Sequence, residues 1–435
     1  MKIRYTLLYI AVACSLFGLP AQQNYTLQEC IEIALENNRN IKQQELNNQQ
    51  RQIAYSQARA DLLPNLNASV GQSFVYGRSI GLDNTYQNTN SSQTSFSIGS
   101  NITLFDGLRM KHNIDARKAE MYISEADLER IQDDIVMSVS TAFLQVLMNK
   151  ELLQIAYDQI ELTKTNLERM SELVSSGKIA KGELFELEAQ LAKEEFNLTQ
   201  SENNLKLSLL DLAQIMELED FTTFDVVVPM DIAVDEGLLL SPNAIYESAL
   251  IARPEIRAAQ YRVESSETEI LIAKSAYYPS LSFGASIGSG YYNMSGFDNA
   301  SFSNQFKNNR STSLGFSLSI PIFNKFQVKN SVKNAQIALE YSKLEIDKTK
   351  IELRKRIEQA YYNAIGAESR WKAADKSEKA SREAYRFAEQ KYETGRGTSY
   401  ELSQAKSNLA NVLSDQTQAK YEYMFRLKIL ELLRD

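Results

Sequence analysis

The spacing of apolar residues changes from a helical period to a strand period at two prolines. Before Pro64 and Pro279, apolar residues recur with the spacing of an amphipathic helix. After each proline, apolar and polar residues alternate, which places them on opposite faces of a strand. Proline lacks a backbone donor and disfavours helical geometry in the residue before it. The pattern therefore predicts helices that lead into strands near residues 65–76, 94–105, 280–291 and 311–323.

The polar face of the predicted strands is uncharged. It consists of Ser, Asn and Gly, with no charged residue between Asn65 and Gly71 or between Ser95 and Thr103. A soluble hairpin with one buried face would also alternate, but its solvated face usually carries Lys and Glu. Each run has roughly the 9 to 11 residues that a tilted strand needs to cross a bilayer. We therefore favour transmembrane strands.

Long polar segments, 77–93 and 289–310, join the strands of each hairpin and are expected to form external loops. Four strands cannot close a barrel, because about eight is the smallest number that spans a membrane. Unpaired strand edges are not tolerated in lipid. The barrel is therefore expected to be shared between several copies of the chain.

Each hairpin is followed by a pair of long helices, expected over 111–175 and 179–216 and again over 328–394 and 398–433. A turn at Gly177 and another at Gly395 separate the members of each pair, since glycine readily takes the left-handed conformation that ends a helix. A seven-residue spacing of leucines predicts coiled-coil packing. These leucines are Leu184, Leu191, Leu198, Leu205 and Leu212.

The chain is an internal duplication, with repeat 1 over 22–240 and repeat 2 over 241–435. Thr26, Ala34 and Pro64 recur 215 residues later as Ser241, Ala249 and Pro279. Each copy contains helices, a hairpin and a pair of long helices, so the two copies are expected to form one architecture. Thr26 with Glu29 forms a predicted capping box. Between the copies, segment 217–240 breaks the helical pattern with a short β-prone run, and we interpret it as a girdle around the long helices.

The N-terminal residues 1–21 have the order of a secretory signal peptide, with basic residues, an apolar run and small residues before a polar segment. Cleavage is expected after Ala21. The alternative is lipidation at Cys14, which follows a small residue but lacks the usual preceding pattern. Cleavage after Ala21 would leave Cys30 as the only cysteine, so no internal disulfide is expected.

The composition disfavours several classes of function. A net charge of −8 does not suit binding to nucleic acid. The single histidine, His112, has no evident partners for a catalytic triad, and neither a phosphate-binding loop nor metal-ligand spacing is present. No catalytic residue, metal or cofactor is therefore predicted.

Several motifs are similar to those of the TolC-like outer-membrane efflux proteins. They are the helix-proline-strand segments ARADLLPNLNASV and AKSAYYPSLSFGA and the turn KYETGRGTSYELSQAKSNL. The resemblance covers the mature chain. It implies a mainly α fold with a small transmembrane β part, in which a homotrimer forms a twelve-stranded barrel on a long helical periplasmic tunnel. It also implies contact with outer-membrane lipid, a periplasmic adaptor protein and an inner-membrane pump in a Gram-negative bacterium.

The resemblance also implies a gate at the turns. Tyr392 and Glu183 match residues that tie neighbouring helical hairpins together at a closed tip, and Glu401 matches an acidic residue that rings the entrance. A glutamate near a helix start is also favoured by the helix dipole, so a plain surface role is the alternative for Glu401. Gln404 stands where some members have a second acidic residue, and Glu186 lies at the corresponding place in repeat 1.

The turns themselves are the expected docking sites for the adaptor. These residues are Gly177, Lys178, Gly395 and Arg396. At Gly397 some family members have an arginine, and here Arg396 lies one place earlier. The arginine contact of the family is therefore in doubt for this chain.

We expect a passive export duct for small molecules or drugs, whose substrates are defined by the partner pump. A duct for type I protein secretion fits the same sequence pattern. In a different class, a trimeric coiled-coil surface protein would share the long helices, but it would be expected to lack duplicated hairpins that begin at matched prolines.

Overall fold

The computed structural model describes residues 23–80, 84–219, 224–228 and 241–434, and its chain forms two compact units. The helical unit takes residues up to 45, 127–256 and 349–435, and the sheet unit takes 46–126 and 257–348. Both units therefore contain segments of both sequence repeats. The signal peptide predicted over 1–21 lies outside the described residues, as do 220–223 and 229–240 of the predicted girdle segment.

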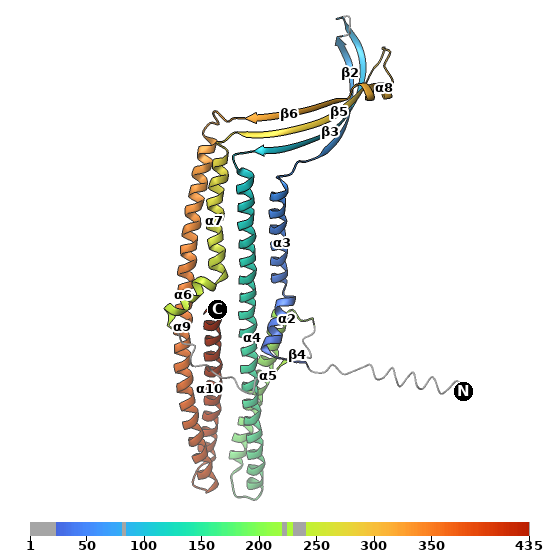
Figure 1. Cartoon of the computed structure of the whole chain (residues 1–435). Helices are drawn as coiled ribbons and strands as arrows, with labels where there is room; N and C mark the ends of the chain where they lie inside the picture. The colour runs from blue at the N-terminus through green and yellow to red at the C-terminus, as the bar shows by residue number, and fades with distance from the viewer. Residues whose placement is uncertain (1–22, 81–83, 220–223, 229–240, 435) are drawn as a thin grey trace, which may run out of the picture. The chain divides into compact units, whose positions relative to one another are not determined.

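Helices make up most of the described chain (Figure 1). The four long ones are α4 (Arg109–Ser175), α5 (Lys181–Ile215), α9 (Gln327–Glu393) and α10 (Ser399–Arg434). Their ends lie within two residues of the ranges expected from the sequence. The shorter helices are α2 (Leu27–Asn37), α3 (Arg39–Ala60), α6 (Pro242–Ala252), α7 (Pro254–Ser275) and α8 (Phe302–Asn308). The predicted capping box of Thr26 and Glu29 is present at the start of α2.

The sheet unit contains one antiparallel sheet with strand order β2-β3-β5-β6. Its strands are β2 (Asn67–Ile80), β3 (Tyr86–Phe105), β5 (Ser280–Met294) and β6 (Ser311–Ser319). Strand β6 ends four residues before the expected residue 323, because Pro321 follows and cannot donate to a neighbouring strand. No helix of the described residues is both long enough and apolar enough to cross a membrane.

The prediction of a loop over residues 77–93 was largely wrong. The β2–β3 pairing runs on through Arg78 with Asn88 to Ile80 with Tyr86, so most of this segment is strand. Its Asn, Ser and Thr composition is typical of loops, but the backbone groups of these residues pair across the hairpin whatever the side chains are. The segment 289–310 was also predicted as loop, and it contains the end of β5 and helix α8.

Helix α8 and its flanking residues cover the end of β5 that extends beyond β6. The pairing of β5 with β6 stops at Gly288, yet β5 continues to Met294. Gln305 accepts from the Tyr292 N–H and donates to the Tyr292 carbonyl, at 2.9 and 2.8 Å. Asn299 makes the same pair of bonds with the backbone of Met294, at 3.0 and 2.8 Å. Side-chain amides thus satisfy a strand edge that would otherwise be open.

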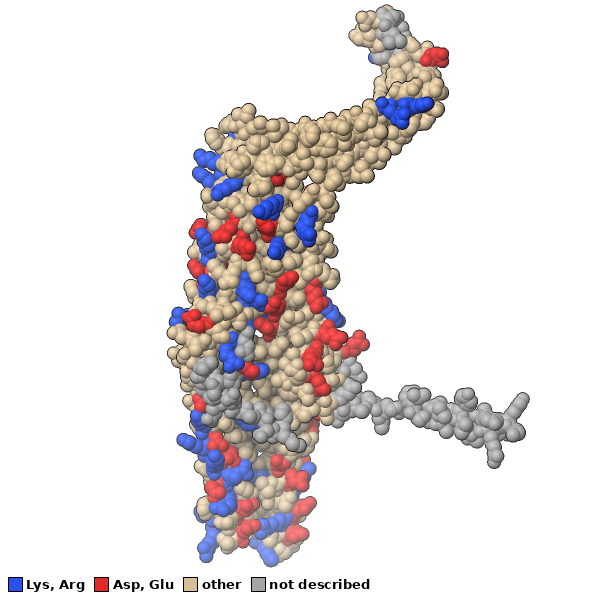
Figure 2. Space-filling view, viewed as in Figure 1, with Lys and Arg blue, Asp and Glu red and all other residues tan. Residues whose placement is uncertain are grey.

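The two faces of the sheet differ in polarity. On one face, serine hydroxyls pair across strands, with 2.7 Å between Ser69 and Ser97 and 2.8 Å between Ser286 and Ser313. On the other face, Val70 and Phe316 are 69% and 72% exposed. Arg78 is the only charged residue within the four strands. Figure 2 accordingly shows a long stretch of surface over the sheet with almost no acidic or basic side chains.

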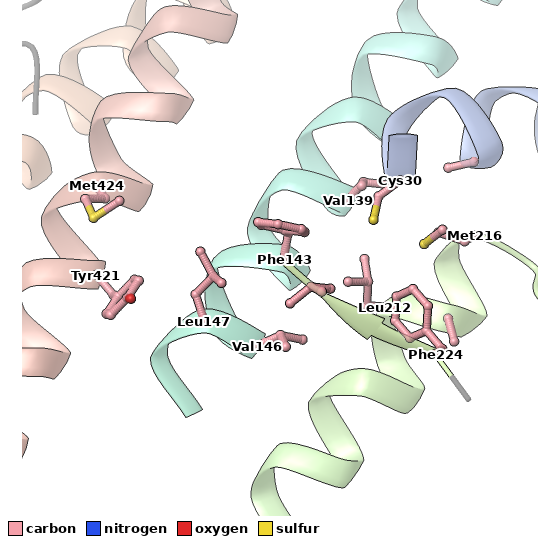
Figure 3. Close-up of a cluster of buried hydrophobic side chains, with 13 residues drawn as sticks. Cys30, Val139, Phe143, Val146, Leu147, Leu212, Met216, Phe224, Tyr421 and Met424 are labelled. Carbon is pink, nitrogen blue, oxygen red and sulfur yellow. The ribbon is translucent and has the colours of Figure 1, made fainter. Parts of the chain in front are cut away.

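The main core of the helical unit joins α2, α4, α5 and α10 around Val139, Phe143 and Leu212. Cys30 points into this core from α2, near Val139 and Met216 (Figure 3). A short parallel pair, β1 (Gln23–Tyr25) with β4 (Phe224–Val226), packs against it through Phe224 and Val226. Strand β4 is the described part of the β-prone run in the predicted girdle segment, whereas β1 was not predicted.

Candidate functional site

The two turns of the helical unit end α4 and α9 in the same way. Gly177 and Gly395 have φ values of 72° and 70°. The Gly177 N–H donates to the Val174 carbonyl and the Lys178 N–H to the Leu173 carbonyl, both at 3.0 Å. The N–H groups of Gly395 and Arg396 bond to the carbonyls of Tyr392 and Lys391 in the same pattern. Both turns are therefore Schellman motifs with the expected glycine in the left-handed position.

The second turn is tightly packed around Gly397. A Cβ there would lie 3.1 Å from both the Lys391 Cβ and the Tyr392 backbone nitrogen. Thr398 follows as the N-cap of α10, and its hydroxyl accepts from the Glu401 N–H at 3.2 Å. This hydrogen bond gives the backbone of Glu401 a structural role at the start of α10.

Tyr392 of α9 and Glu183 of α5 belong to different helical hairpins, and the carboxylate is near enough to act on the tyrosine electrostatically. Burial raises the pKa of the half-buried Tyr392 hydroxyl, the Glu183 carboxylate raises it further, and Arg169 opposes the increase. The Tyr392 hydroxyl is therefore protonated at neutral pH. Arg169 of α4 also approaches Glu393 of α9, with 3.8 Å between a guanidinium nitrogen and a carboxylate oxygen.

The other predicted site residues lie on the surface of the described chain. Glu186 is exposed on α5, and Glu401 and Gln404 are exposed one helical turn apart on α10. Lys178 and Arg396 are exposed at the two turns. In a single copy of the chain Glu183 thus acts electrostatically on Tyr392, and Glu401 faces solvent.

A buried polar cluster nearby was not predicted. Lys406 of α10 is 3% exposed, and its Nζ donates to the Gln159 carbonyl at 3.0 Å and to the Thr163 hydroxyl. It also lies 3.5 Å from the Glu194 carboxylate of α5. Burial lowers the pKa of the Lys406 amine, and Glu194 opposes the decrease. We call Lys406, Glu194 and Thr163 the buried tie.

The sequence contained a signal for the buried tie. Lys406 lies four residues after Leu402 and three before Leu409, so it falls on the same face of α10 as these leucines. Glu194 lies three residues after Leu191 and four before Leu198, so it falls on the same face of α5 as these leucines. A lysine and a glutamate within apolar helix seams are candidates for a buried ion pair, because neither side chain is buried readily without a partner.

Two cavities adjoin the buried tie. One has a volume of about 40 Å³ and is lined by residues of α4, α5, α9 and α10, including Tyr392 and Lys406. The other, of about 260 Å³, lies among α4, α5 and α10 and includes Glu194, Asn197 and Asn411 in its lining. Within the described part of the chain, no cluster of three or more His, Cys, Asp or Glu could hold a metal ion.

Comparison with known families gives a match over both repeats. The family described as "Outer membrane efflux protein" matches residues 30–216 and 245–432. Among curated proteins, the toluene efflux pump outer membrane protein TtgC of Pseudomonas putida is 24% identical over 399 residues, covering 88% of this chain and 77% of TtgC. The probable outer membrane lipoprotein SilC of Salmonella typhimurium is 23% identical over 71% of this chain, which spans 64% of SilC.

Solved structures share the fold. CusC superposes with a TM-score of 0.79 at 16% identity, covering 97% of this chain and 95% of CusC. The CmeC outer membrane channel of Campylobacter jejuni gives a TM-score of 0.78 at 16% identity, over 94% of this chain and 85% of CmeC. The predicted fold class, mainly helical with a small β part, is therefore confirmed for the chain.

Proposed function

Because the chain belongs to the outer membrane efflux protein family, it is an efflux protein of the outer membrane, and we propose that three copies form one passive duct. The four-stranded sheet is the observation that carries this proposal. Strands β2 and β6 are its two edges, and each pairs with a single strand of the described chain. Three such sheets give twelve strands, enough to close a barrel without an exposed edge.

The polarity of the sheet supports this assembly. Its apolar face, with Val70 and Phe316, suits contact with outer-membrane lipid, whereas its serine face suits a water-filled lumen. A wall without formal charge along most of its length does not reject either cations or anions. The substrates that we propose are small organic molecules, in line with the names of relatives described as toluene and antibiotic efflux pump proteins.

The chain supplies no chemistry to drive transport in this proposal. Energy and substrate choice come from an inner-membrane pump, and a periplasmic adaptor protein docks at the turns formed by Gly177, Lys178, Gly395 and Arg396. These residues lie at the surface of the helical unit, with Lys178 and Arg396 exposed to a partner. In this proposal a bond from the Tyr392 hydroxyl to the Glu183 carboxylate holds the duct closed between uses, and the electrostatic influence of Glu183 on Tyr392 supports it.

The assembly can be tested on the purified mature protein. We expect a trimer in detergent that dissociates only on heating, and small, stable single-channel currents in planar bilayers. Protein that has been boiled before reconstitution is the control, and it should give no currents. A folded monomer with full β content in detergent would contradict the shared barrel, because four strands would then be stable with both edges open.

A further inference from the structure

In the first half of α10 the fully buried residues are polar, whereas its apolar residues, such as Leu402 and Leu409, are only half-buried. The buried apolar residues of this helix all lie from Tyr421 onward, and the only buried residues before it are Lys406 and Thr417. Ser403 donates to the Gln190 side chain of α5, and Thr417 donates to Glu151 of α4 at 3.2 Å. The second half of α10 is therefore fixed by an apolar core, and the first half is not.

The buried tie is the centre of these polar contacts. The Lys406 ammonium group donates to Gln159 and Thr163 and forms an ion pair with Glu194. Glu194 also accepts from Gln159 at 3.2 Å and from Gln190 at 2.9 Å. These contacts join α10 to both α4 and α5. A displacement of α10 by one ångström or so would break them, because hydrogen bonds tolerate little change in distance.

The neighbouring cavity would give the Glu194 carboxylate access to water if these contacts broke. It has a volume of about 260 Å³, and Glu194, Asn197 and Asn411 contribute to its lining. Such a polar space can hold water that would hydrate Glu194 once Lys406 has moved away. The engaged ion pair therefore lies next to a space in which Glu194 could be hydrated if the pair separated.

We propose that the buried tie is a latch that holds the first half of α10 against α4 and α5 and is released when the duct opens at its turn end. This inference rests on the proposed function, because it assumes that the turn end opens. The latch differs from the contact between Tyr392 and Glu183, since it joins α10 instead of α9 to the first helical hairpin. Breaking both latches would be required for full opening.

The rate of thiol labelling can test the latch without any measurement of conduction. Thr417→Cys places a thiol at a site that is 1% exposed, so labelling requires the seam to open. In this background, Lys406→Met leaves Glu194 buried without its cation and should raise the labelling rate by about tenfold or more. Adding Glu194→Leu to that variant removes the stranded charge, so the labelling rate should return close to the starting value.

Matched variants separate local opening from other effects. Lys428→Met removes a lysine from the partly exposed pair with Glu431 on the same helix, and it should leave the labelling rate unchanged. Cys30 lies in the apolar core and should stay unlabelled in every variant. An unchanged rate in Lys406→Met, an equal rise in Lys428→Met, or simultaneous labelling of Cys30 would each overturn the latch.

Single-channel recordings on the same variants connect the latch to the duct. Lys406→Met should increase the mean conductance, and the double variant with Glu194→Leu should reverse the increase. Faster labelling with unchanged conductance would mean that the seam does not control the pore, which overturns the proposal. If the parent protein forms no channel but the labelling pattern holds, the proposed function fails while the tie between the helices stands.

Discussion

Cys30 shows how strongly the environment of one residue controls its chemistry. Its side chain is fully buried in the core among α2, α4 and α5, and burial raises the pKa of the thiol to about 12. The neutral thiol reacts slowly with maleimides, because the thiolate is the nucleophile. Cys30 therefore behaves as a small apolar side chain and does not react with maleimides in the native protein.

We predict that native protein resists maleimide labelling of Cys30 between pH 7 and pH 9. Over this interval the thiolate fraction of an exposed cysteine rises roughly tenfold or more, but the raised pKa keeps Cys30 protonated. Mass spectrometry of protein labelled before and after denaturant should show modification only after unfolding. Ser176→Cys, at an exposed position of the first turn, is the reactive control. Fast labelling of the native core at pH 9 would contradict the burial of Cys30.

At the scale of elements, the sequence predicted the long helices and strands well because their spacing signals extend over many residues. The proline-marked strands and the glycine-ended helices α4 and α9 depend on backbone rules that hold in any context. The β2–β3 tip was missed because Gln87–Gln93 pairs through its backbone and carries loop-like side chains. Lys406 and Glu194 were missed because their meeting depends on how α10 packs against α5, which heptad spacing alone does not determine.

Tyr392 and Glu183, near the two turns, allow a test of the proposed gate. Replacing Tyr392 with Phe and Glu183 with Ala removes the donor and acceptor of the proposed charge-assisted bond, which would be worth about 1.5–3 kcal/mol gross in each copy. The double variant should show higher single-channel conductance than the parent. Lys178→Ala, at an exposed residue of the first turn, is the control. Unchanged conductance in the double variant would mean that the contact between Tyr392 and Glu183 does not hold the gate.

Glu401 should affect the gate differently, since it faces solvent in the single chain. Three copies around a narrow axis would attract multivalent cations. We therefore expect Glu401→Ala to weaken block by such cations without raising conductance. Persistent block would place the ring elsewhere, with Glu186 as the next candidate.

At the scale of the whole molecule, the proposed duct requires one orientation in the outer membrane. The β2–β3 tip should face the outside of the cell, and the turns at Gly177 and Gly395 should face the periplasm. Asn88→Cys and Ser176→Cys place thiols at exposed positions near the tip and at the first turn. Because Cys30 is buried, each variant carries one reactive thiol if the signal peptide is removed.

A maleimide on a polyethylene glycol chain too large for porins distinguishes the two sides in intact cells. It should modify the Asn88→Cys variant and leave the Ser176→Cys variant unmodified, because the second thiol is shielded by the membrane. Permeabilising the outer membrane should make both thiols reactive, which controls for local burial. Labelling of the turn but not the tip in intact cells would invert the topology. The uncharged serine face could then no longer be assigned to a path that leads out of the periplasm.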